Sequence, residues 1–235
     1  MLAISKLHPD LLQILTEFSD WFYARDNSDL DSFVGKNPKM KDVSKKEMAD
    51  EATSMAYLQE ALKNTKKYGY PAHSWGLELA HDSAYYNAPD VKEHARKTND
   101  KLMNFFGARN NALQMYYPAG GYIGWHNNGN ARGYNIVLSC NQGADGEFEH
   151  WDHVNNKLNV FPDQAGWNCK VGYFGPFEEP DKVYWHCART RTPRLTFSYV
   201  IFDKNIWEDM VADINCDWLY DWCKCKDQLL SKLNY

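Results

Sequence analysis

Apolar residues recur at helical spacing through the first part of the chain. Over residues 9–24 they form an i, i+3, i+4 stripe whose opposite face is acidic and polar, as in a helix that packs on a core through one face. A second helix is predicted from Ser44, with Glu47 three residues later in a capping-box pattern, to about Lys67. A third helix is predicted over residues 90–106, with a glycine directly after it.

From Asn111 the pattern changes to short runs of β-branched and aromatic residues separated by Gly, Asn, Asp and Pro. The runs are NALQMYYP, YIGWH, GYNIVLSC, GEFEHW, CKVGYFG, KVYWHC and RLTFSYVIF. Strands this short and this closely spaced predict a sandwich or barrel and not parallel βαβ units. After Asp203 the apolar residues return to helical spacing as far as Leu219, which predicts a C-terminal helical segment.

No repeat, low-complexity tract or linker divides the 235 residues into separate domains. The predicted organisation is a helical region over 1–110, a β core over 111–203 and a helical segment over 204–235, all in one structural unit. The fold class is α+β. Because a sheet needs its apolar face and its edges covered, we expect the helices to pack on the core.

Composition narrows the classes of partner. A formal net charge of −5 does not favour nucleic acid or an anionic membrane as a partner. The chain shows no signal-peptide pattern and no run of roughly 18–20 apolar residues that could span a membrane, so a cytoplasmic protein is expected. The aromatic share of 15% fits either a bulky core or an aromatic-lined pocket.

The cysteines are expected to be free thiols, most of them buried. None of them forms a Cys-x-x-Cys pair, and two that are two residues apart in a predicted helix would point about 200° apart, a poor geometry for sharing one metal. The six are Cys140, Cys169, Cys187, Cys216, Cys223 and Cys225.

Three segments of the β core carry candidate chemistry: YPAGGYIGWHNN at 117–128, YWHC at 184–187 and PRLTFSYVIF at 193–202. Together they place two histidines at strand ends, His126 and His186, and then Arg194 at the start of the last strand. A two-histidine site with open positions suits iron and oxygen activation. A guanidinium can hold a carboxylate through two hydrogen bonds.

Hydroxyl groups near that arginine would complete an anion pocket. The candidates are Thr196 and either Tyr116 or Tyr117. Two other arginines, Arg189 and Arg191, compete with Arg194 for the anchoring role. Arg194 is preferred, because Thr196 lies two residues further along the same strand and therefore on the same face.

In these residues the chain resembles the iron(II)/2-oxoglutarate dioxygenase superfamily of prolyl-hydroxylase type. That family has a Tyr-x-x-Gly-x-x-Ile-x-x-His-x-Asp strand, which Tyr117, Gly120, Ile123 and His126 match position by position. His186 matches the distal histidine. The Arg-x-Thr pair at 194–196 matches the residues that bind the far carboxylate of 2-oxoglutarate.

Two further segments resemble the family's pattern between the metal motifs: GEFEHWD at 146–152 and AGWNCKVGYFG at 165–175. The resemblance spans roughly residues 111–202. It implies a double-stranded β-helix (jelly-roll or cupin-like) core, iron(II) as cofactor, and 2-oxoglutarate and O2 as co-substrates. The implied reaction is hydroxylation of a carbon centre on a peptide side chain or small metabolite.

One position departs from the family: Asn128 stands where the acidic metal ligand is expected. In one possibility its neutral oxygen binds the metal weakly, or water or an anion takes its place. A carboxylate from another strand is a second possibility, and a site that binds without turnover is a third. The candidate carboxylates are Asp145, Glu147, Glu149 and Asp152.

Four residues near these motifs are not assigned to the site. Trp125 and Trp185 precede the two histidines and should therefore point into the core, and His150 and His153 are expected to be solvated surface residues. Besides the oxygenase, two functions stay open: a binding protein that keeps the fold without turnover, and a metal-free β-sandwich that binds carbohydrate. The primary substrate is not indicated by the sequence.

Overall fold

The computed structural model describes residues 1–4, 6–36, 45–80, 86–109 and 111–215. Its helices are α1 (Pro9–Ala24), α2 (Ser28–Asp31), α3 (Ala49–Ala52), α4 (Met55–Leu62), α5 (Pro89–Phe106) and α6 (Lys204–Ile214). Short 3-10 turns cover Lys46–Met48, Thr65–Tyr68 and Pro180–Lys182. The strands are β1 (Leu2–Ile4), β2 (Ser74–Trp75), β3 (Leu77–Glu78), β4 (Asn111–Tyr117), β5 (Tyr122–His126), β6 (Gly133–Asn141), β7 (Glu147–Asp152), β8 (Lys157–Pro162), β9 (Gly166–Phe174), β10 (Trp185–Arg189) and β11 (Arg194–Ile201).

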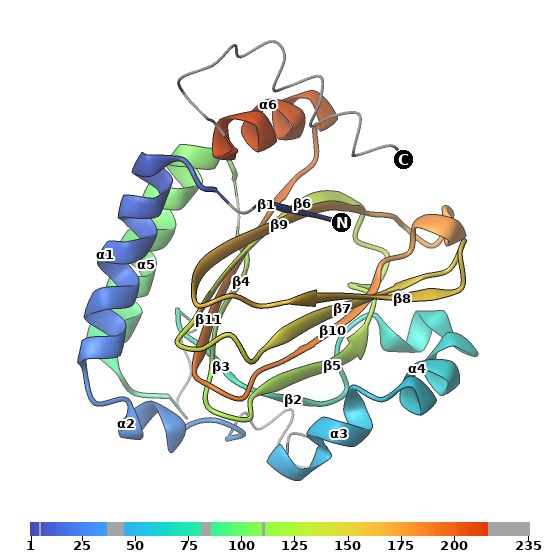
Figure 1. Cartoon of the computed structure of the whole chain (residues 1–235), viewed down its shortest axis with the longest axis horizontal. Coiled ribbons are helices and arrows are strands. Elements are labelled where there is room, and N and C mark those ends of the chain that lie inside the picture. The colour runs from blue at the N-terminus through green and yellow to red at the C-terminus, as the bar shows by residue number, and fades with distance from the viewer. Residues whose placement is uncertain (5, 37–44, 81–85, 110, 216–235) are drawn as a thin grey trace.

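The strands form two sheets that face each other (Figure 1). One sheet has the order β1-β9-β6-β11-β4-β3 and the other has the order β2-β5-β10-β7-β8. Every pairing within them is antiparallel. From β4 to β11 the chain passes back and forth between the sheets, which is the topology of a jelly roll. The predicted α+β class with a double-stranded β-helix core is confirmed.

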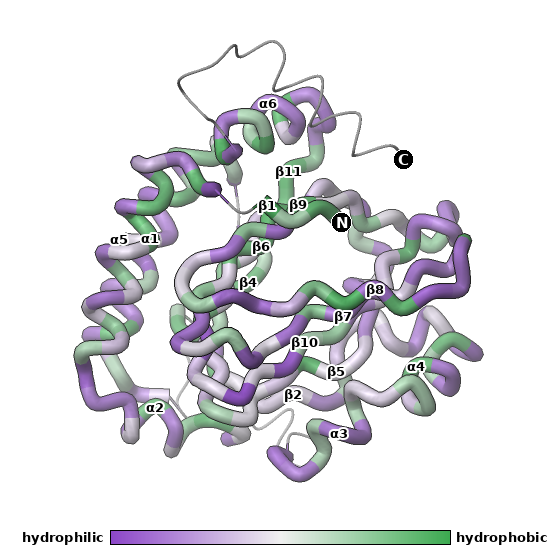
Figure 2. Tube along the Cα trace, in the orientation of Figure 1, coloured by the Kyte–Doolittle hydropathy of each residue, from purple (hydrophilic) through white to green (hydrophobic). Residues whose placement is uncertain are grey.

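Alternation along β11 shows how the sequence builds this core. Leu195, Phe197 and Tyr199 point outward and belong to the main apolar core with residues of α1 and α5. Arg194 and Thr196 point the other way, into the space between the sheets. Figure 1 shows α1 and α5 side by side along the six-stranded sheet, and the mixed colours of α1 in Figure 2 show its alternating apolar and polar positions.

The outer face of the five-stranded sheet has a smaller core. Trp125 and Trp185 are fully buried there against Leu58 and Ala61 of α4. The interpretation of both tryptophans as core residues is confirmed. They therefore lie directly behind the histidines that follow them in sequence.

The predicted helices hold to different extents. The first and third match α1 and α5, and α5 ends at Gly107, whose φ of 59° is left-handed as such a cap requires. The second is wrong as one helix, because the chain breaks at Thr53 and Ser54 caps α4 by accepting a hydrogen bond from the Tyr57 N–H. The proposed cap at Ser44 lies outside the described residues.

The N-terminal region is not only helical, since β1, β2 and β3 each add an edge or near-edge strand to a sheet. At the other end α6 packs on the main core, and the remainder of the predicted C-terminal helix lies outside the described residues. Cys140, Cys169 and Cys187 are free and buried, as predicted. The other three cysteines lie outside the described residues.

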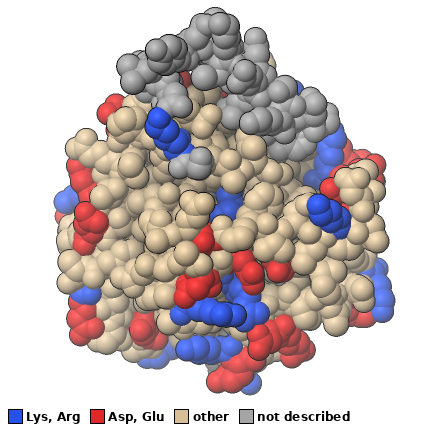
Figure 3. Space-filling model, in the orientation of Figure 1, with Lys and Arg blue, Asp and Glu red and all other residues tan. Residues whose placement is uncertain are grey.

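Charged side chains of both signs are visible on one face of the molecule (Figure 3). On the face seen in Figure 3, acidic and basic side chains are interspersed. Among the described helices, none combines the length and apolar character needed to cross a membrane.

Candidate active site

A cavity of about 310 Å³ lies between the two sheets. His126 and His186 line one part of it, and Arg194 and Thr196 line another. Its walls are mostly apolar. They include Phe33, Leu77, Leu113, Met115, Ile123, Val137, Phe148, Phe174 and Ala188. A mainly apolar cavity with a few convergent polar groups is the usual form of a small-molecule site.

The two histidines are direct cross-strand partners. His126 ends β5 and pairs in register with His186 of β10, and their ring centroids are 4.1 Å apart. The Nδ1 of His126 lies 2.9 Å from the carbonyl oxygen of Gly124, and the Nδ1 of His186 lies 2.9 Å from that of Tyr184. A carbonyl oxygen only accepts, so each Nδ1 carries the hydrogen and each Nε2 keeps its lone pair.

Both histidines are held in the neutral form. Burial is the main cause, and it lowers the pKa of His126 to about 4. Burial, followed by the neighbouring His126, also lowers the pKa of His186 well below its usual value. At neutral pH the pair therefore presents two unprotonated nitrogens, which is the state that a metal ion requires.

Aromatic side chains enclose the histidine pair. Phe148 stacks on His186 at a centroid distance of 5.4 Å, and Phe174 lies 5.1 Å from the same ring. Bulky apolar neighbours keep water away from His186, which is the burial that lowers its pKa.

At the other end, Arg194 and Thr196 lie on the inner face of β11 and are buried. The Nε of Arg194 and the Oγ1 of Thr196 have no hydrogen-bond partner among the described residues. Tyr117 of β4 pairs in register with Arg194 and also lines the cavity. Burial raises the pKa of Tyr117 to about 12, although the Arg194 charge opposes the shift. Tyr117 is therefore a neutral phenol beside the guanidinium.

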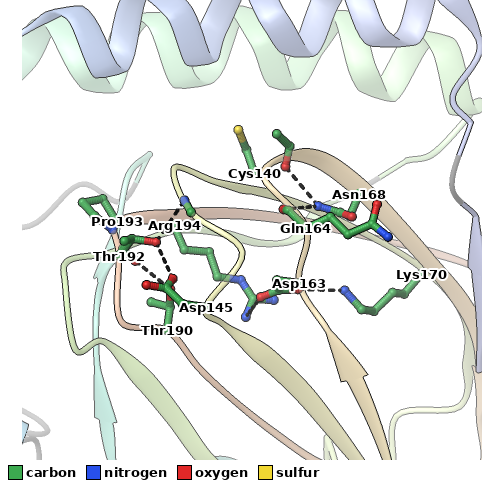
Figure 4. A network of polar contacts seen from close by, with 12 residues as sticks. Cys140, Asp145, Asp163, Gln164, Asn168, Lys170, Thr190, Thr192, Pro193 and Arg194 are labelled. Carbon is green, nitrogen blue, oxygen red and sulfur yellow. Dashed lines mark hydrogen bonds and ion pairs between the residues drawn. The ribbon is translucent and has the colours of Figure 1, made fainter.

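Two further charged residues lie at the arginine end, and the sequence analysis did not single them out (Figure 4). Asp163 directly follows β8. Its Oδ2 lies 3.0 Å from Arg194 Nη1, and its Oδ1 lies 3.0 Å from Lys170 Nζ. Lys170 belongs to β9. One signal was present in the sequence: a lysine inside the otherwise apolar run CKVGYF is costly unless it has a buried partner.

The competing candidates for the anion pocket lie elsewhere. Tyr116 points to the opposite face of β4, where its hydroxyl donates to Asp31 Oδ1 at 2.9 Å, so the alternative of Tyr116 is wrong and Tyr117 takes its place. Arg189 pairs with Asp50 at the surface, and Arg191 is exposed. Of the three arginines, Arg194 alone lines the cavity.

The structure does not bring a carboxylate to the histidine pair. Glu147 and Glu149 pair in register with Arg189 and Cys187, on the face of β10 opposite to His186. Asp145 accepts a hydrogen bond from Thr192, and Asp152 accepts two from Asn155. Within the described ranges no three His, Cys, Asp or Glu side chains group as metal ligands. The alternative of a carboxylate from another strand is therefore not supported.

Asn128 does lie at the site. It lines the cavity and hydrogen-bonds with His126. Its φ of 60° is left-handed, a conformation that Asn and Asp adopt more readily than most residues. Asn128 therefore lies beside the histidine pair, with an amide at the position where the sequence pattern expected a carboxylate.

The other two histidines singled out in the sequence, His150 and His153, are partly buried and so are not fully solvated as predicted. His150 pairs in register with His186 and stacks on Tyr184 at a centroid distance of 3.8 Å. Burial lowers its pKa to about 3. His153 is half-buried, and burial lowers its pKa too. Because His150 is engaged with Tyr184, it does not complete a three-histidine group in the described residues.

Comparisons with known proteins give structural likeness only. No protein-family model matches the chain, and no curated protein matches it in sequence. Among solved structures, the chain is similar to a prolyl-4-hydroxylase from Pseudomonas putida, with 14% identity, a TM-score of 0.34, and coverage of 67% of this chain and 86% of that one. A prolyl hydroxylase from Trichoplax adhaerens, in complex with a hypoxia-inducible factor peptide, gives 11% identity, a TM-score of 0.35, and coverage of 68% and 80%.

A third similar structure is an oxidoreductase of the 2OG-Fe(II) oxygenase family from Burkholderia pseudomallei. It has 17% identity and a TM-score of 0.33, and the match covers 54% of this chain and 65% of that one. Likeness at this level assigns neither activity nor residue roles to this chain. Its own side chains have to carry both.

Proposed function

We propose that the chain is an iron(II)- and 2-oxoglutarate-dependent oxygenase that hydroxylates a carbon centre. One observation carries the proposal: a single cavity has a neutral, in-register histidine pair at one end and a buried arginine with an unpartnered Nε at the other. The first feature suits a borderline metal. The second suits the far carboxylate of a short keto diacid.

The residues present fit both groups. His126 and His186 would hold iron through Nε2, since each Nδ1 is fixed by a carbonyl oxygen. Arg194, Thr196 and the hydroxyl of Tyr117 would hold the far carboxylate. The buried atoms of Arg194 and Thr196 that lack partners among the described residues gain them in this arrangement, which removes the cost of leaving them unsatisfied. Asn128 offers a neutral oxygen as third ligand, or leaves that position to water.

Bound iron would supply oxygen activation, so that one O2 and one 2-oxoglutarate give succinate, CO2 and one hydroxyl group on the substrate. The chain's own contribution is position and environment. Phe148 and Phe174 exclude water around His186. Arg194 fixes the direction in which the keto acid lies, and the rigid pairing of β5 with β10 fixes the distance between the histidines.

The cavity mouth gives a coarse view of the primary substrate. Tyr70 and Glu78 line the cavity and are exposed, and Tyr70 is 83% exposed. An aromatic and apolar entrance with one carboxylate suits an apolar or cationic group. A peptide side chain or a small metabolite meets this description.

Turnover tests the proposal. Purified protein is incubated with iron(II), ascorbate and 2-oxoglutarate in air, and succinate is measured with and without a library of peptides and small metabolites. We expect slow succinate release alone and faster release with a substrate, both lost in His186→Ala. Succinate release equal in wild type and His186→Ala would refute iron-dependent turnover at this site.

A second function is favoured by one specific observation. Asn128 replaces the expected carboxylate, and the described residues offer no other acidic group to the histidine pair. A chain of this kind would bind the metal and the keto acid without turnover. It would take up iron(II) and 2-oxoglutarate as the oxygenase does, and would release no succinate with any substrate.

A further inference from the structure

Three buried charges meet at the arginine end of the cavity (Figure 4). Asp163 Oδ1 accepts a hydrogen bond from Lys170 Nζ at 3.0 Å, and Asp163 Oδ2 lies 3.0 Å from Arg194 Nη1. The side chains of Lys170, Asp163 and Arg194 are 3%, 0% and 3% exposed. Two cations share one anion, so with Lys170 protonated this largely buried triad carries a net charge of +1.

The triad is not internally satisfied. The Arg194 contact is an ion pair without a directed hydrogen bond, because Asp163 Oδ2 makes none within the described residues. Arg194 Nε, Thr196 Oγ1, Ser139 Oγ and both amide atoms of Asn141 also lack partners there. Ser139 and Asn141 are the register partners of Thr196 and Arg194 on β6, so their side chains share the inner face of the sheet. Native cores seldom leave so many polar atoms without partners unless a ligand or water completes them.

Local packing fixes Asp163 against its backbone neighbours. Its N–H donates to the Gly146 carbonyl at 2.8 Å. A Cβ built on Gly146 would lie 2.6 Å from Asp163 Oδ2, so glycine is the residue that leaves room for the carboxylate. Lys170 is equally fixed, because it lies on β9 opposite Val137 on one side and Ala3 on the other. Backbone hydrogen bonding and strand pairing therefore hold both residues in position.

We propose that Asp163 and Lys170 are specificity-determining residues of the anion site, and that Asp163 sets its net charge to +1. The inference rests on the proposed function and deepens it. A ligand tail with one negative charge brings the buried triad to neutrality: two cations, Asp163 and one carboxylate. A tail with two negative charges, such as a phosphonate above its second pKa, leaves an uncompensated buried charge, which is strongly disfavoured. The site therefore selects a keto acid with a carboxylate tail over one with a phosphonate tail of the same length.

Charge counting makes this testable with three variants. Asp163→Asn raises the net charge of the triad to +2, Lys170→Met lowers it to zero, and the double variant returns it to +1. The probes are 2-oxoglutarate and 4-phosphono-2-oxobutanoate, which differ only in the tail. Binding is measured anaerobically by calorimetry on the protein loaded with cobalt(II), and Asp145→Asn is the matched control. Asp145 lies at the same end of the barrel and bonds Thr192 without an ion pair to Lys170 or Arg194.

We expect wild type, the double variant and Asp145→Asn to prefer 2-oxoglutarate by about tenfold or more, the size of one charge-assisted contact. Asp163→Asn should reverse or abolish that preference, and Lys170→Met should weaken both probes. If Asp163→Asn folds and keeps the wild-type preference, Asp163 is a purely structural link between the sheets and the proposal is overturned. If Asp163→Asn does not fold, Lys170→Met still decides, because unchanged affinity for both probes in that variant overturns the proposal.

A second measurement separates a failure of the charge-count proposal from a failure of the proposed function. Cobalt(II) uptake is followed in the same samples by its visible spectrum before either probe is added. Normal cobalt uptake with no tail preference contradicts the charge-count proposal alone. Absent cobalt uptake contradicts the histidine metal site, and calorimetry of the metal-free protein with the same two probes then tests the triad by itself.

Discussion

At the histidine end of the cavity the polar groups are neutral, whereas the arginine end holds three buried charges. His126, His186 and Asn128 carry no charge at neutral pH, and aromatic rings surround the pair. Arg194 and Lys170 instead share Asp163. One cavity can therefore bind two ligands of opposite charge. The neutral lone pairs of the histidines suit a cation, and the excess positive charge at the other end suits an anion.

The largest effect is expected from removing a histidine. His126→Ala or His186→Ala should reduce iron(II) or cobalt(II) affinity by more than about a hundredfold, since each histidine supplies one of only two imidazole ligands. Metal titration followed by the cobalt spectrum measures it. His150→Ala is the matched control, because His150 stacks on Tyr184 and should be dispensable for binding. Equal metal affinity in His126→Ala and wild type would show that the histidine pair is not the metal site.

Acid should destabilise the metal-free protein through the same pair. The folded pKa of His126 is lowered from 6.5 to about 4, so between these values the unfolded chain binds more protons and stability rises with pH. The stability of the neutral pair is complete above about pH 6.5 and is lost as the pH falls toward 4. For His126 the loss is of the order of 3 kcal/mol. Urea unfolding from pH 4.5 to 7.5 measures this loss. If the free energy of unfolding of His126→Gln varied with pH as it does in wild type, His126 would not be its source.

Removing the charge at the other end should affect the keto acid and not the metal. Arg194→Met is expected to weaken 2-oxoglutarate binding about thirtyfold to a hundredfold, as when one partner of a buried charged pair is truncated. Cobalt uptake should change little. Arg189→Met is the control, since Arg189 pairs with Asp50 at the surface. An unchanged requirement for 2-oxoglutarate in Arg194→Met would show that the two ends do not hold the two ligands separately.

The smallest effect should come from restoring a carboxylate at the histidine end. Asn128→Asp is nearly isosteric, and Asp tolerates the left-handed φ of 60° at this position. It should raise iron(II) affinity about tenfold, because an anionic oxygen binds a divalent cation better than an amide oxygen does. Competition with a chelator of known affinity measures the change. Unaltered affinity would mean that residue 128 contributes no ligand atom.

The sequence predicted what depends on local pattern. Alternation along one strand put Arg194 and Thr196 on one face and the tryptophans behind the histidines, and both placements hold. The same rule, applied to β4, separates Tyr116 from Tyr117 once the direction of one residue is known. Helix α1 and the glycine cap of α5 followed from periodicity and backbone preference.

The missing parts depend on register between distant strands. Asp163 follows β8 on one sheet, while Lys170 and Arg194 belong to the other, and spacing along the chain does not state that they meet. The supposed acidic alternatives failed for the same reason, since Glu147 and Glu149 face outward only because of the register of β7 with β10. The second predicted helix broke at Ser54, where a capping side chain competes with helix continuation.

The central claim is that one cavity binds iron(II) at the histidine pair and a keto acid anchored at Arg194. The most direct test is an anaerobic titration of the metal-free protein with iron(II) and 2-oxoglutarate, which follows the weak visible charge-transfer band of an iron–keto acid chelate. We expect a band that saturates at one iron and one keto acid per chain, is absent in His186→Ala, and needs far more 2-oxoglutarate in Arg194→Met. A wild-type protein that shows no band at saturating concentrations of both ligands would contradict this claim.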